Sequence, residues 1–216
     1  CVVTNMKIAL IFVGIISLST CRPDTQSQTQ QQELQVTNDL LNYPDLAAKQ
    51  QFNATAYFHD VWYVVSTFNP QTPSNKKEDK TLCIQFTSQI LENGNARQFH
   101  TQRDESEPYL YVEMIINHAE LQNGVGKFIA QTRSVDKEGN SELPYYPSRI
   151  TVIDTDYSNY SVEYKCVKLQ KDVSCIYLIL SRKPYVVDPN VEPIANKLNL
   201  KLQDFTLMNK PGCGVD

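Results

Sequence analysis

Few residues in this chain could do chemistry, and His100 stands out among them. It lies in the stretch NARQFHTQRDESEPYLYVEM, residues 95–114, ahead of the aromatic pair Tyr109 and Tyr111. A neutral imidazole is a common metal ligand. His59 and His118 fall near expected strand ends, where structural or exposed positions are favoured. His100 is therefore the first candidate for binding chemistry.

The motifs that mark common enzyme active sites do not occur. The sequence holds no GxSxG, HExxH or CxxC motif and no phosphate-binding glycine loop. Its carboxylates show no spacing typical of an acid–base pair. The sequence favours a binding protein, not an enzyme.

Composition favours one all-β domain. The 216 residues are 41% hydrophobic and include 12 Tyr and 8 Phe, which is enough for a sizeable core. The net charge of −4 argues against a nucleic-acid or anionic-membrane partner, because both attract clustered Lys and Arg.

The beginning of the chain has the features of a secretory signal. Residues 6–19, MKIALIFVGIISLS, combine Lys7 with an apolar run too short to span a bilayer, and Ser17 and Ser19 suit a cleavage site. We expect cleavage there, residues 1–5 to be read-through, and the protein to be secreted and extracellular. An uncleaved anchor and a lipoprotein signal are the alternatives.

The composition of the chain after the signal segment changes near residue 54. Residues 20–54 are rich in Gln and Thr and predict a flexible leader. Residues 55–216 carry short β-rich runs separated by polar turns, without βαβ alternation. We expect eight strands, at 60–68, 82–88, 96–103, 109–117, 127–133, 144–154, 160–169 and 175–182. Eight successive antiparallel strands can close into an up-and-down barrel, which removes exposed edges.

A helix is expected after the last strand. Asp188 is a good N-cap and Pro189 suits the first helical position. One apolar face then follows at helical spacing, formed by Val191, Ile194, Ala195 and Leu198.

Four stretches carry a family resemblance over most of positions 57–213: YFHDVWYV (57–64), GKFIAQTRSVDKEGN (126–140), ITVIDTDYSNYSVEYKC (150–166) and KDVSCIYLILSRKP (171–184). In order and spacing the chain resembles the lipocalins and, among them, the nitrophorins, which are salivary haem lipocalins of blood-feeding triatomine bugs. The resemblance implies an eight-stranded barrel closed at one end by Trp62 and Arg182.

The resemblance also implies a role for His100. In the nitrophorins a histidine nine residues before an aromatic binds haem iron, and His100 precedes Tyr109 by nine residues. This implies haem b on His100, nitric oxide on the opposite side of the iron, and uptake of histamine. The alternative is a solvated strand histidine, because its neighbours Gln98 and Gln102 are polar.

Two positions depart from the family pattern. Asn69 matches an acidic residue of the first loop and loses a carboxylate that could pair with an amine. Val173 matches a leucine of the mobile loop over the ligand pocket and keeps an apolar lid. Both are expected at the ligand site.

The cysteines are expected to form disulfides after export. The resemblance implies the pairs Cys83–Cys213 and Cys21–Cys166. Cys175 has no family counterpart, and a Cys166–Cys175 bridge that frees Cys21 is the alternative.

Two sequons, at Asn53 and Asn159, predict N-linked glycans in a secretory cell.

Three functions follow from these features. The first is a haem carrier of nitric oxide that sequesters histamine. The second is a haem-free scavenger of biogenic amines, nucleotides or eicosanoids, whose pocket would use Tyr109, Tyr111 and acidic loop residues. The third is an inhibitor of a host haemostatic protein, such as a protease or adhesion receptor, acting through the leader and the acidic loop 103–107.

Overall fold

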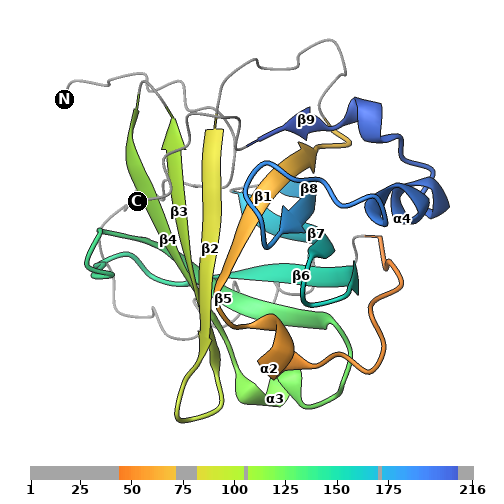
Figure 1. Ribbon diagram of the computed structural model, residues 1–216. Helices are drawn as coiled ribbons and strands as arrows, with labels where there is room; N and C mark the ends of the chain where they lie inside the picture. Colours follow the sequence, from red (N-terminus) through yellow and green to blue (C-terminus); the bar gives the residue numbers. More distant parts are fainter. Residues whose placement is uncertain (1–43, 72–81, 105–106, 170–171, 209–216) are drawn as a thin grey trace.

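A closed β-barrel forms the centre of the computed structural model, which describes residues 44–71, 82–104, 107–169 and 172–208 (Figure 1). Its strands are β1 (Val61–Phe68), β2 (Leu82–Ile90), β3 (Ala96–Asp104), β4 (Glu107–Ile116), β5 (Lys127–Val135), β6 (Tyr146–Thr155), β7 (Tyr160–Leu169) and β8 (Asp172–Ser181). Consecutive strands pair antiparallel, and β1 pairs with both β2 and β8. The predicted eight-stranded lipocalin barrel is confirmed.

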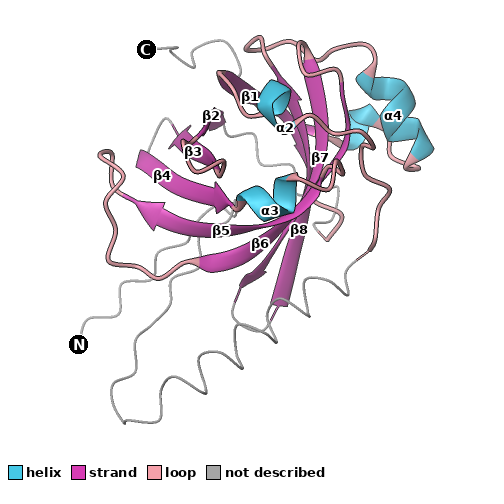
Figure 2. Cartoon of the chain, turned by 90° about the horizontal axis from the view of Figure 1, so that it is seen from below, coloured by secondary structure: helices cyan, strands magenta, loops and turns pink. Residues whose placement is uncertain are grey.

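The structure adds short elements that the sequence did not predict. Helices α2 (Ala54–Tyr57) and α3 (His118–Leu121) lie at one end of the barrel, as Figure 2 shows from below. The two-residue strand β9 (Thr206–Leu207) pairs with β1. β8 begins earlier than expected because its ladder with β7 continues to the pair Leu169↔Asp172. None of the helices in the described part of the chain is long and apolar enough to cross a membrane.

An apolar layer covers the outside of β7, β8 and β1. Helix α4 (Val191–Lys197) buries Val191, Ile194 and Ala195 in this layer, and Leu198 packs against it. The predicted apolar face is therefore confirmed. The N-cap is Asn190 instead of Asp188, because the Asp188 carboxylate accepts a hydrogen bond from the Asn190 backbone N–H in the turn before the helix.

Residues 44–53 lie against the barrel, although a flexible leader was expected up to Ala54. The Lys49 N–H donates to the Val152 carbonyl at 2.8 Å, and the Lys49 carbonyl accepts from Gly126 at 2.8 Å. A Cβ at Gly126 would lie 3.0 Å from the Val152 oxygen, so only glycine fits this crossing without displacement. The Lys49–Asp154 ion pair ties the same segment to β6.

Trp62 and Arg182 close the end of the barrel that carries α2 and α3. The Arg182 guanidinium carbon lies 3.6 Å from the centre of the fully buried Trp62 ring. The same guanidinium donates to the carbonyls of Tyr57, His59, Val61 and Tyr157. Stacking and hydrogen bonds together hold α2, β1 and the β6–β7 turn in one place, as the family resemblance implied.

The expected Cys21–Cys166 pairing is wrong. Cys166 and Cys175 form a disulfide, because they lie directly opposite each other on β7 and β8 with 4.2 Å between their Cα atoms. The bridge is therefore the alternative that the sequence left open. Cys83 is also disulfide-bonded, and its expected partner Cys213 lies outside the described residues, as does Cys21.

Replacing Arg182 should weaken the whole fold. We expect Arg182→Met to lower the free energy of unfolding by about 2 kcal/mol, because it removes the cation–π contact and leaves several carbonyls without their donor. Urea denaturation followed by Trp62 fluorescence measures this change. Lys183→Met removes one charge next along the chain and serves as the control. Equal stability of the two variants would contradict a closing role for Arg182.

Candidate ligand-binding site

A cavity lies inside the barrel, on the side away from Trp62. Its volume is about 40 Å³, and its described lining comes from all eight strands: Val64, Ile84, Phe86, His100, Gln102, Leu110, Val112, Thr132, Tyr146, Ser148, Lys165, Val167 and Leu178. Most of these side chains are apolar, and the polar ones gather on two opposite walls. Such a mainly apolar hollow with a few polar groups is typical of small-molecule sites.

His100 is one of the two basic groups in this cavity. Its ring stacks on Phe86 with 3.9 Å between centres, and its Nε2 lies 2.7 Å from the Gln98 side-chain oxygen. Gln98 is itself buried and donates to Ser88. Burial, and to a lesser extent the charge of Lys165, hold the pKa of His100 well below its usual value. The imidazole is therefore neutral at pH 7. The solvated-histidine alternative is wrong, because only 8% of His100 is exposed.

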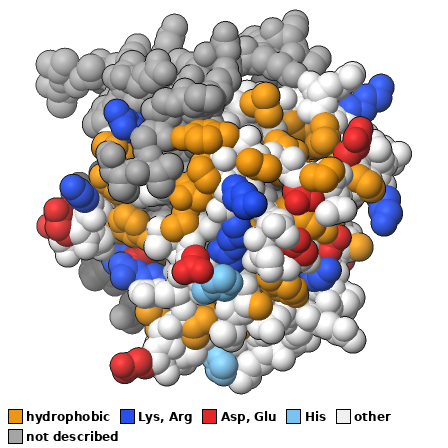
Figure 3. All heavy atoms as spheres, in the orientation of Figure 1, with side chains coloured by type: hydrophobic (Ala, Val, Ile, Leu, Met, Phe, Trp, Pro, Cys, Tyr) orange, Lys and Arg blue, Asp and Glu red, His pale blue; other side chains and the backbone are white. Residues whose placement is uncertain are grey.

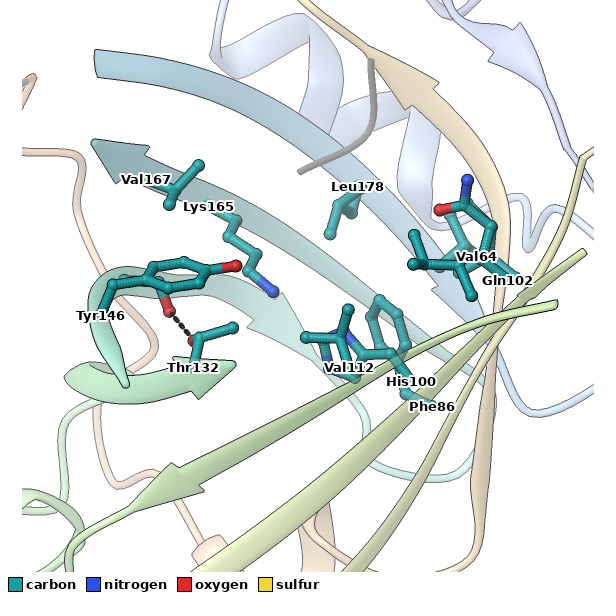
Figure 4. A pocket seen from close by; sticks show the side chains of 13 residues that line it. Val64, Phe86, His100, Gln102, Val112, Thr132, Tyr146, Lys165, Val167 and Leu178 are labelled. Carbon is teal, nitrogen blue, oxygen red and sulfur yellow. Dashed lines mark hydrogen bonds between the residues drawn. The ribbon is translucent and has the colours of Figure 1, made fainter. Parts of the chain in front are cut away.

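Lys165 is the second basic group. Figure 4 shows its side chain extending from β7 across the cavity toward His100 on the opposite wall. Only 5% of Lys165 is exposed, and this burial lowers its pKa to about 8. The amine therefore still carries its charge at neutral pH. Sequence reasoning missed Lys165, although its place between Tyr164 and Cys166 in an alternating strand was visible.

Tyr146 adds a hydrogen-bond donor beside Lys165. Burial raises its pKa to about 12, so its hydroxyl stays protonated. The hydroxyl oxygen is buried and has no hydrogen-bond partner among the described residues. Figure 4 shows Thr132 close to Tyr146, and the Thr132 hydroxyl bonds to the Ser148 hydroxyl at 2.7 Å. Among the described lining residues none is Asp or Glu. The cavity is therefore rich in donors and poor in negative charge.

Tyr109 and Tyr111 are not among the described residues that line this cavity, and their role in ligand binding stays a prediction. On β4 it is Leu110 and Val112 that point inward, and successive strand residues face opposite sides. Tyr109 is 45% exposed on the outer face. Its ring stacks on Tyr111, which stacks on Phe99, and Arg103 lies over Tyr109.

Asn69 and Val173 also lie away from the cavity. The Asn69 side chain accepts a hydrogen bond from the Gln71 backbone just after β1. Val173 is buried in the apolar layer outside β8. Neither residue is among the described residues that line the cavity, and their roles at the ligand site stay predictions.

The remaining predicted positions lie at the closed end. Asn53 caps α2 by accepting a hydrogen bond from Ala56, and Asn159 donates to Asp156 in the β6–β7 turn. Both asparagines are exposed, and glycosylation at either stays a prediction. His59 contacts Asp60 and His118 contacts Gly94, both at the surface. Figure 3 shows one face of the molecule, where charges of both signs are interspersed with apolar groups.

The surroundings of His100 do not fit haem. A haem iron needs a free imidazole nitrogen and a flat space beside it. Here Nε2 is engaged by Gln98, one ring face is covered by Phe86, and Lys165 extends from the opposite wall.

Comparison with solved structures agrees with this barrel. The tryptamine complex of the amine binding protein of Rhodnius prolixus superposes with a TM-score of 0.65 at 23% identity, over 76% of this chain and 84% of that one. A selenomethionine derivative of a biogenic amine-binding protein gives 0.64 at 23% identity, over 75% and 84%. Identities this low support the fold alone.

Sequence comparison gives the family. Triafestin-2 of Triatoma infestans is 32% identical over 84 residues, or 37% of this chain and 39% of that protein. Pallidipin of Meccus pallidipennis is 33% identical over 63 residues, or 29% and 34%. The matched segments thus span little more than a third of these relatives. The Nitrophorin family model matches residues 44–216, which is most of the chain. The chain therefore belongs to the nitrophorin family.

Proposed function

We propose that this protein is a haem-free carrier of a small amphiphile with an anionic head, such as a fatty-acid-like or eicosanoid-like carboxylate. The observation that carries the proposal is the buried ammonium of Lys165 in a cavity whose described lining combines apolar side chains with hydrogen-bond donors and holds no carboxylate. The ammonium places a positive charge at the cavity wall, and among the described lining residues none is a carboxylate, so the cavity favours a ligand of opposite charge.

The neighbours of Lys165 favour the same ligand class. Tyr146 offers a buried hydroxyl that has no partner among the described residues, and a carboxylate has two oxygens that can accept hydrogen bonds. The ligand's apolar body would lie against Val64, Val112 and Leu178, which line the cavity around the polar groups.

An amine ligand is the second candidate, because two structurally similar proteins carry amine binding in their names. A protonated amine in this cavity would meet the ammonium of Lys165 and no lining carboxylate among the described residues. Like charges in a low-dielectric site repel strongly. The lining therefore favours an anion over histamine or tryptamine. Nitric oxide carriage depended on haem and is not part of the proposal.

The setting of this function follows the sequence-based expectations. We propose that the protein is secreted into saliva and acts as a binder, not an enzyme. Removing a small signalling lipid from the host would not require a protein partner. Inhibition of a host haemostatic protein through the outer surface would apply if no small ligand binds.

Lys165→Met should weaken binding of an anionic amphiphile by about ten- to a hundredfold, because a charge-assisted hydrogen bond contributes about 1.5–3 kcal/mol. Calorimetric titration with arachidonate, and with tryptamine in a parallel cell, measures the effect. Lys168→Met is the matched control, since Lys168 lies on the same strand but on its outer side. Tryptamine binding without arachidonate binding would favour the amine candidate instead.

Binding should also depend on pH in a defined direction. The affinity should be constant below pH about 8 and should fall as the pH rises through that value, because Lys165 loses its charge there. Above this midpoint the loss approaches about tenfold per pH unit. Repeating the calorimetric titration with arachidonate between pH 6 and pH 10 measures this fall in affinity. An affinity that instead rises with pH would contradict an anion on Lys165.

Haemin should not acquire a histidine ligand in this protein. We expect the Soret band of haemin mixed with the folded chain to match that of a His100→Ala variant, because Nε2 is already bonded to Gln98. A sharp Soret shift in the unmodified protein that disappears in the variant would restore the haem interpretation.

A further inference from the structure

A carboxylate lies buried just below the cavity, toward the closed end. Glu163 is 4% exposed and accepts a hydrogen bond from the Tyr57 hydroxyl, which also lies 3.0 Å from the Ser161 hydroxyl. Tyr57 is fully buried and belongs to the aromatic cluster at the closed end. This acid does not line the cavity, and the proposed binding site does not use it.

Glu163 and Lys165 face the same way. They are two positions apart on β7, and residues two apart on a strand point to the same side of the sheet. The intervening Tyr164 packs in the outer apolar layer, so both charged side chains point into the barrel. The barrel interior therefore holds one buried cation and one buried anion at neighbouring inward positions of one strand.

We propose that Glu163 is the fixed counter-charge of the anion site: held by the Tyr57 hydroxyl, its carboxylate keeps Lys165 in the cationic form that receives the ligand. This role rests on the proposed function for its ligand. Glu163 thus acts as a positioning residue through Lys165 and does not touch the ligand itself.

The charges around Lys165 support this assignment. His100 on β3 faces it as a neutral base, Tyr146 on β6 is a neutral donor, and Glu163 is the acid. Burial lowers the pKa of Lys165, and the charge of Glu163 acts in the opposite direction. Burial likewise raises the pKa of Glu163, while the Tyr57 hydrogen bond and Lys165 act against this rise. Each charge therefore stabilises the other.

The decisive test is the titration of Lys165 in Glu163→Gln. The amide keeps an oxygen for the Tyr57 hydroxyl but removes the negative charge. Carbon-13 NMR of labelled lysine side chains, with the Lys165 signal assigned by its loss in Lys165→Met, gives the midpoint directly and needs no ligand. We expect the midpoint to fall by about one pH unit or more, since one nearby charge in a dry interior has an effect of this order. An unchanged midpoint would overturn the proposal.

Two further variants separate charge from packing. Glu163→Asp keeps the charge, so its Lys165 midpoint should lie close to that of the unmodified protein. A purely structural role predicts instead that Glu163→Asp lowers the midpoint as much as Glu163→Gln does. Glu113→Gln removes an equally buried carboxylate on the outer face, where it pairs with Arg97 and Arg133, and should leave the Lys165 midpoint unchanged. A shift in Glu113→Gln as large as that in Glu163→Gln would contradict the assignment.

Ligand affinity distinguishes this inference from the function on which it rests. In Glu163→Gln the pH at which arachidonate affinity falls should decrease together with the Lys165 midpoint. The affinity at pH 6 should be unchanged or higher. If arachidonate binding does not depend on Lys165 at all, the proposed function fails, and the NMR midpoints still decide the role of Glu163. If Glu163→Gln does not fold, the same NMR titration is carried out on His100→Gln, which removes the imidazole that faces Lys165. The Lys165 signal should then show a second step as Glu163 protonates. Absence of this second step would overturn the proposal.

Discussion

Closure of one end of the barrel by Trp62 and Arg182 is the constraint on which the interior depends. The guanidinium donates hydrogen bonds to carbonyls of α2, β1 and the β6–β7 turn while it covers the Trp62 indole. Water is therefore excluded from the closed end of the barrel. Every polar group above this closure must then find its partner inside the protein or in a guest. Ser88, Gln98 and His100 form one internal chain of hydrogen bonds, and Tyr57, Ser161 and Glu163 form another.

Strand β7 shows how the surroundings decide which face of a strand is polar. Its residues alternate between an apolar set, which includes Val162 and Cys166, and a polar set, which includes Glu163 and Lys165. On a barrel exposed to water the polar set would face out. Here α4 and the residues after it cover the outer face, so the apolar set is buried outside and the polar set lies inside. The charged interior therefore depends on the apolar layer packed around it.

Much of the fold was predictable from the sequence, because alternating runs and turn residues are local signals. The eight strands and the buried face of α4 needed no tertiary information. The site was less predictable, since it depends on which face points inward. His100 lies opposite Val112 in the β3–β4 register, so an inward His100 requires Tyr109 and Tyr111 to point outward. Register also places Cys166 opposite Cys175, which a family-based pairing could not foresee. Lys165 was missed because the sequence alone does not show which face of β7 points into the barrel.

Strands β1 and β2 are hydrogen-bonded to each other along only part of their length. β1 and β2 pair only from Val61↔Thr87 to Tyr63↔Gln85, near the closed end, and β9 occupies the edge of β1 farther along. Beyond Tyr63 no ladder bond joins these two strands in the described chain. β2 can therefore hinge outward without breaking a ladder bond to β1. The space that the barrel can offer a guest is therefore not limited by β1–β2 ladder bonds beyond Tyr63.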